Sequence, residues 1–216
     1  MQKEKAQQTI TRAYNFELRA KNDEAHGTYI EGRPIVYGSM TDLGYFNEII
    51  EPGALTDTDL KDVRFLVNHN TDMIPLARSR RNNDNSTMQM TVDEKGMSIR
   101  VNLDVENNTD AKNLYSAVKR GDISGMSFMF SVDNEEWEDL ESEHPTRYIK
   151  KIGQVLEVSA VTFPAYEATE ISARAKETLD SVKSTLDSVR AQSIIKNDNA
   201  NDVELEKLKA HYLYDI

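Results

Sequence analysis

The histidine with the most suggestive setting for acid–base chemistry is His69. It ends segment 61–70, where Val63, Phe65 and Val67 alternate with it at a period of two residues. We therefore expect His69 at the end of a strand, on the side that faces inward. There its imidazole can serve as a general base, although a hydrogen-bonded histidine with a purely structural role is an open alternative. The chain has three other histidines, in a polar turn, an acidic segment and the C-terminal tail: His26, His144 and His211.

Ser127 is the serine whose setting best suits a nucleophile. Segment 126–132 alternates strictly, with Met126, Phe128 and Phe130 on one face and Ser127 on the other. Burial of those apolar neighbours fixes the backbone and aims the hydroxyl. A serine hydroxyl becomes nucleophilic only when an adjacent imidazole accepts its proton. The competing nucleophile is Ser124, in the turn just before this strand.

A third group usually orients the imidazole and stabilises its charge, and Glu157 is the candidate for that role. Leu156, Val158 and Ala160 share one face of the expected strand 148–163, which puts Glu157 on the other face. A carboxylate near a core is costly without a partner. The alternative is an ordinary exposed glutamate.

The composition removes several classes of chemistry. The absence of cysteine excludes a thiol nucleophile, disulfides and thiolate metal sites, and we expect no cofactor. A formal net charge of -11 argues against binding nucleic acid over a broad surface. The sequence contains no apolar stretch of about 20 residues, so we expect no membrane association. The polar first residues lack the apolar core of a secretion signal.

The elements that must position these side chains are mostly strands. Expected strands cover 12–19, 28–37, 46–52, 61–70, 87–92, 97–103, 126–132 and 148–163. Segment 109–120 has a helical stripe, with Thr109 placed to cap its start and Gly121 its end. The acidic segment 133–144 lacks periodicity and is interpreted as an exposed or disordered loop. The predicted class is mainly β with flanking helices, an α+β fold.

Three regions are expected along the chain: a mobile N-terminus at 1–9, a folded domain at 10–173 and a helical tail at 174–216. Leu179, Val182, Leu186 and Val189 form a narrow apolar stripe in the tail. The stripe suits either a docking helix or a helix packed on its own domain.

Three blocks of sequence surround the candidate residues: FLVNHNTDMIPLAR (65–78), KRGDISGMSFMF (119–130) and VLEVSAVTFPAY (155–166). In this order and spacing they resemble the HK97-type prohead protease family of tailed bacteriophages. An upstream block, IEGRPIVYGSMTDLGYFNEIIEPGAL (30–55), is also similar to the family. The resemblance covers about residues 28–173.

The resemblance implies that Ser127 of GMSF is the nucleophile, that His69 of VNHN is the base and that Glu157 of LEVS is the third member. It also implies a fold related to herpesvirus assembly proteases, a β-barrel decorated by helices, in which the third member is a second histidine. Many relatives have glycine two residues after the serine, where this chain has Met129. A bulky side chain there leaves the oxyanion donors unassigned.

The function implied by the resemblance is a serine endopeptidase of phage prohead maturation. Its expected substrates are the scaffold protein, the major capsid protein and the protease itself, inside the immature capsid in the host cytoplasm. Homo-oligomerisation is expected as well. The main alternative is a non-catalytic assembly factor built on a protease-like domain. A metal-dependent hydrolase seeded by His69 and Asp72 is a weaker alternative, because no second ligand stands at a suitable spacing.

Overall fold

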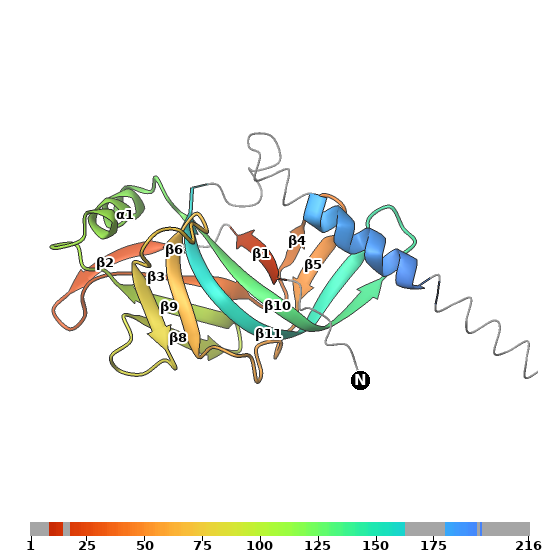
Figure 1. The fold of residues 1–216 in the computed structure, drawn as a ribbon, viewed down its shortest axis with the longest axis horizontal. Helices are drawn as coiled ribbons and strands as arrows, with labels where there is room; N and C mark the ends of the chain where they lie inside the picture. The colour runs from red at the N-terminus through yellow and green to blue at the C-terminus, as the bar shows by residue number, and fades with distance from the viewer. Residues whose placement is uncertain (1–8, 15–17, 163–179, 194, 196–216) are drawn as a thin grey trace, which may run out of the picture.

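The computed structural model describes residues 9–14, 18–162, 180–193 and 195 of the 216-residue chain. Strands dominate this part, with one helix inserted between them and a second near the C-terminus (Figure 1). The strands are β1 (Thr9–Tyr14), β2 (Arg19–Asp23), β3 (Gly27–Val36), β4 (Met40–Asp42), β5 (Asn47–Ile50), β6 (Asp62–Val67), β7 (Ala77–Arg80), β8 (Met88–Asp93), β9 (Gly96–Asn102), β10 (Gly125–Glu138) and β11 (Thr146–Val161). The helices are α1 (Thr109–Arg120) and 180–193.

Two sheets make up the fold. The larger contains seven strands in the order β1-β10-β11-β5-β4, with β6 pairing β11 and β7 pairing β6. The smaller has the order β2-β3-β9-β8. One edge of β11 is shared by two parallel partners, β5 at its start and β6 at its end. Figure 1 shows the long β10–β11 hairpin running across the molecule, with α1 at one end and helix 180–193 at the other.

The core lies between the two sheets. Phe65 of β6, Phe128 of β10 and Val158 of β11 are fully buried in one cluster with Ile30 and Met97 of the smaller sheet. Alternation along each strand turns these side chains to one face and leaves the opposite face of β10 and β11 free for polar residues. The predicted α+β class, rich in strands, is therefore confirmed.

The predicted barrel is not confirmed. In the part of the chain that the structure describes, β1, β4 and β7 each end a branch of the larger sheet, β2 and β8 end the smaller one, and no ladder closes either into a ring. Strand β11 branches instead, with β5 paired along its start and β6 along its end.

The acidic segment 133–144 is the largest error in the predicted elements. Strand β10 continues to Glu138 and pairs with β11 as far as Thr146, so residues 133–138 are strand rather than loop. Several register shifts interrupt this ladder, and they blur the period-two pattern on which the prediction relied. The expected strand 12–19 is also divided, since β1 ends at Tyr14 and β2 begins at Arg19.

Helix α1 has the predicted bounds, but its cap is one residue earlier than expected. The side chain of Asn108, not Thr109, accepts hydrogen bonds from the backbone N–H groups of Asp110 and Ala111. Gly121 ends the helix with φ of 82°, the left-handed conformation that glycine adopts without strain. The expected strands 87–92 and 97–103 are present as β8 and β9, which pair antiparallel.

Helix 180–193 packs on the larger sheet. Val182 and Leu186 are buried with Leu43 and Phe46, and Trp137 packs against the same cluster. The tail boundary predicted at residue 174 and Leu179 lie outside the described residues. Within the described ranges, neither helix is long and apolar enough to span a membrane.

Candidate active site

His69 lies in the turn after β6, not in the strand itself. Asn68 and His69 both have positive φ, 52° and 56°, a conformation that non-glycine residues seldom adopt. The Asn68 side chain stabilises this turn by donating to Thr162 Oγ1 and accepting from the Thr162 N–H. The turn ends the alternation of β6, so His69 stands just beyond the strand end at which it was predicted, with its side chain 22% exposed.

The imidazole instead meets a buried carboxylate. Nδ1 of His69 lies 2.5 Å from Oε1 of Glu157, whose side chain is 4% exposed. An ionised carboxylate can only accept hydrogen bonds, so Nδ1 carries the proton and Nε2 of the neutral ring is left as an acceptor. The interpretation of Glu157 as an exposed glutamate is thus excluded.

Ser159 lies two residues after Glu157 on β11 and links the carboxylate with the turn that holds His69. Its hydroxyl donates to Glu157 Oε2 at 2.6 Å and accepts from the backbone N–H of His69 at 3.1 Å. Both carboxylate oxygens of Glu157 are therefore hydrogen-bonded, which stabilises the charged form inside the protein. The turn, the imidazole and the carboxylate form one connected network.

Ser127 lies on the same face of the sheet as this network. In the β10–β11 ladder Ser127 is the register partner of Ser159, and such partners project to the same side. Ser127 is 0% exposed, and its hydroxyl donates to the backbone oxygen of Arg12 in β1 at 2.7 Å. In the described part of the chain, the Ser127 hydroxyl is not hydrogen-bonded to the His69 ring.

The competing candidates stand elsewhere. Ser124 is exposed in the turn before β10. His26 contacts Asp23, and His144 contacts Asn47 at the far end of the large sheet, while His211 lies outside the described residues. Met129 is the register partner of Glu157, on the same face as Ser127.

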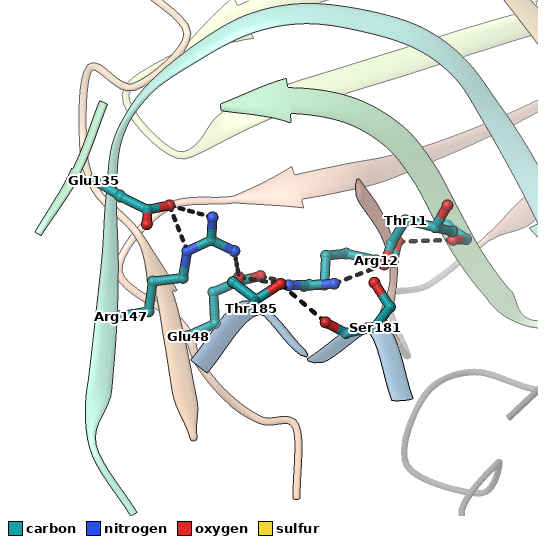
Figure 2. Close-up of polar contacts among 8 residues, drawn as sticks. Thr11, Arg12, Glu48, Glu135, Arg147, Ser181 and Thr185 are labelled. Atoms are coloured by element: carbon teal, nitrogen blue, oxygen red, sulfur yellow. Dashed lines mark hydrogen bonds and ion pairs between the residues drawn. The ribbon is translucent and has the colours of Figure 1, made fainter. Parts of the chain in front are cut away.

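A second polar network, also on the larger sheet, anchors β1. Glu48 of β5 accepts from Arg12 Nε at 2.5 Å and Nη2 at 2.8 Å, and from Arg147 Nη1 at 2.9 Å. Figure 2 shows Glu48 between the two guanidinium groups, with Arg147 also bound to Glu135. Burial alone would raise the pKa of Glu48, but the charges of Arg12 and Arg147 outweigh it and hold that pKa below its usual value.

The sequence analysis missed Ser159 and every member of the second network, Arg12 included. The sequence did offer a signal for Ser159, because this residue follows Glu157 by two positions and therefore shares its face of the strand. Arg12 had no signal, because only the fold brings β1 beside β10. The metal-site alternative finds no support, because no group of three or more histidine or acidic residues that can hold a metal occurs within the described ranges.

Comparison with known proteins places this geometry in context. The family model described as caudovirus prohead serine protease matches residues 14–184. No curated protein sequence matches the chain. A solved structure, the capsid assembly protease gp21 of bacteriophage T4, is 12% identical and has a TM-score of 0.42, over 74% of this chain and 100% of that one. So distant a likeness carries no argument here. The family match spans most of the chain, from the end of β1 into helix 180–193, and the chain therefore belongs to the caudovirus prohead serine protease family.

Proposed function

We propose that the chain is a serine endopeptidase of prohead maturation in which Ser127 is the nucleophile, His69 the general base and Glu157 the group that orients the imidazole. The observation that carries this proposal is the bond between His69 Nδ1 and the buried Glu157. That bond leaves Nε2 to accept a proton, on the sheet face that also holds Ser127.

The proposed reaction is acyl transfer to Ser127 followed by hydrolysis. Ser127 Oγ attacks a peptide carbonyl while His69 Nε2 takes the hydroxyl proton. The imidazolium, stabilised by Glu157, then protonates the leaving amine. A water molecule, deprotonated by the same imidazole, then hydrolyses the acyl-enzyme. Ser159 acts as a positioning residue, because it holds both the His69 backbone and the Glu157 carboxylate.

The proposed substrates follow from the family. They are the major capsid protein and the scaffold protein, cut inside the immature capsid in the infected host, with the chain itself as a further substrate. Association with other copies of the chain is part of this proposal.

Co-expression with the major capsid protein of the same virus tests the proposal. Wild-type protein is expected to give capsid protein fragments detectable by mass. Ser127→Ala and His69→Ala should lower cleavage by about a thousandfold or more. The matched control is Ser131→Ala, which removes a buried hydroxyl four residues along β10 that has no hydrogen-bond partner in the described part of the chain. Cleavage that survives Ser127→Ala would contradict the assignment.

One observation favours a second candidate, a non-catalytic assembly factor. The hydroxyl of Ser127 is engaged by the Arg12 carbonyl and not by the imidazole. The same co-expression separates the two functions, because an assembly factor keeps its effect on shell formation in Ser127→Ala and yields no capsid protein fragments with either form.

A further inference from the structure

Strand β1 occupies the outer edge of β10, at the level of Ser127. Its six residues pair antiparallel with β10, from Thr9 opposite Ser131 to Tyr14 opposite Met126. Because β1 ends the larger sheet, its removal would expose the hydrogen-bonding edge of β10. An extended peptide adds to a sheet at such an edge through main-chain hydrogen bonds that do not depend on its sequence.

The register brings a peptide carbonyl of β1 to the candidate nucleophile. Ala13 is the partner of Ser127, and the carbonyl of the preceding residue, Arg12, accepts the Ser127 hydroxyl at 2.7 Å. A substrate must present a main-chain carbonyl within similar reach of the same oxygen. Here, however, the hydroxyl proton is directed to the carbonyl oxygen, so the imidazole cannot receive it.

A buried ion pair adds to the main-chain pairing of β1. Arg12 is 6% exposed and makes two hydrogen bonds to the fully buried side chain of Glu48. Glu48 also binds Arg147, so the carboxylate keeps a cationic partner when β1 leaves. Departure of β1 therefore breaks the Arg12 contacts without leaving the Glu48 charge unpaired.

We propose that the edge of β10 beside Ser127 is the binding site for an extended peptide substrate, which adds as an antiparallel strand, and that β1 occupies this site in the resting protein. β1 must leave before a substrate can reach Ser127. The inference rests on the proposed function, since it takes Ser127 as the nucleophile.

A reversible cross-link tests whether β1 must move. The chain has no cysteine, so the double variant Thr9→Cys/Ser131→Cys can form one disulfide between β1 and β10. The matched control is Thr91→Cys/Ser98→Cys, another threonine–serine pair, across the β8–β9 ladder of the smaller sheet. A fluorophosphonate probes Ser127: an Oγ–P bond forms, the P–F bond breaks, fluoride leaves and the hydroxyl proton passes to His69.

The oxidised Thr9→Cys/Ser131→Cys protein should react with the probe about tenfold or more slowly than its reduced form, because reaction follows the fraction of molecules with β1 released. Oxidation of the control pair should leave the rate unchanged. If the two redox forms of Thr9→Cys/Ser131→Cys react at equal rates while the reduced protein still cuts the capsid protein, the inference is overturned and the proposed function stands. A redox effect without capsid cleavage supports the inference and counts against the proposed substrates. Absence of labelling in every form counts against both.

A second variant loosens β1 without a cross-link. Arg12→Ala should speed amide hydrogen exchange of residues 9–14 and raise the labelling rate of Ser127 by about tenfold. Arg120→Ala is the control, since it removes an exposed ion pair between the last residue of α1 and Asp122, two residues beyond the helix. Faster exchange of β1 with an unchanged labelling rate would overturn the inference, because β1 would then not limit access to Ser127.

Discussion

Glu157 and His69 define the site at the scale of single residues. Glu157 is a buried carboxylate with one oxygen on the imidazole and the other on the Ser159 hydroxyl. This arrangement fixes the tautomer of the ring and stabilises the positive charge that the ring acquires when it takes a proton. Removing the charge but not the shape of Glu157 therefore isolates its electrostatic contribution.

Glu157→Gln should lower kcat for capsid protein cleavage by about a hundred- to ten-thousandfold, with KM nearly unchanged, because the imidazolium loses its counter-charge. Cleavage time courses with purified capsid protein measure both constants. Glu136→Gln, a change at an exposed carboxylate on the same hairpin, is the control. A Glu157→Gln enzyme with the wild-type kcat would show that the carboxylate has only a structural role.

Ser159→Ala should have a smaller effect, about tenfold on kcat, because the main contact between His69 and Glu157 survives. KM should stay constant, which a general loosening of the substrate site would not produce. The thermal midpoint, measured alongside, separates lost orientation of the imidazole from lost folding. A loss of kcat that matches the loss of folded protein would refute the positioning role.

The sequence predicted on which strand faces the candidate residues lie better than it predicted how they meet. Alternation along 126–132 and 155–160 is enough to put Ser127 and Glu157 on the strand faces that point away from the core. The approach of His69 to Glu157 was not predictable in this way. It depends on the left-handed backbone conformation of residues 68 and 69, which leaves no periodic pattern in the sequence. The contact of Ser127 with Arg12 joins residues 115 positions apart and has no local signal.

At the scale of elements, the parts with local signals were predicted and the outer part of the long β10–β11 hairpin was not. Helix α1 has an apolar stripe and both caps within its own sequence, so its bounds were recoverable. The outer part of β10 contains acidic residues because it projects beyond the core, and its stability comes from pairing with β11. A pattern based on burial misses a strand of this kind.

The cap of α1 gives a prediction at this scale. Asn108→Ala should lower the free energy of unfolding by about 1 kcal/mol, because two backbone N–H groups lose their acceptor. Asn108→Ser, which retains a capping oxygen, should remain close to wild type. Urea unfolding measures both. Equal stability of Asn108→Ala and Asn108→Ser would contradict the assignment of the cap.

At the scale of the whole molecule, Glu48 joins strands that lie far apart in the sequence. It links β1 through Arg12 with β11 through Arg147, and helix 180–193 packs on the same part of the large sheet (Figures 1 and 2). Removal of Glu48 would leave two buried guanidinium groups without their shared carboxylate. The stability of the N-terminal strand and of the large sheet should therefore depend on one ionised group.

Glu48 should also contribute to acid sensitivity. Its pKa is held below the ordinary value, so the unfolded chain binds this proton more readily than the folded protein. The stabilisation is present above about pH 4.3, the usual pKa of glutamate, and is lost as pH falls through the lower folded value. Urea midpoints between pH 7 and pH 3 should fall more steeply for wild type than for Glu48→Gln. Parallel curves would show that Glu48 is not a source of the acid sensitivity.

Self-processing is a further prediction about the whole chain. If residues in the tail region 174–216 are removed by the enzyme itself, wild-type protein should lose mass after expression, and Ser127→Ala should keep its full mass. Intact-mass spectrometry of the two proteins measures this directly. Full-length wild-type protein after capsid cleavage has begun would exclude removal of the tail.

In the proposed mechanism the imidazole of His69 activates the Ser127 hydroxyl. Peptide mapping of protein treated with a fluorophosphonate identifies the activated hydroxyl. A phosphonyl group is expected on Ser127 in the wild type, with about a thousandfold slower labelling in His69→Ala. A phosphonyl group on Ser124 or Ser159, or equal labelling of Ser127 in His69→Ala, would contradict this mechanism.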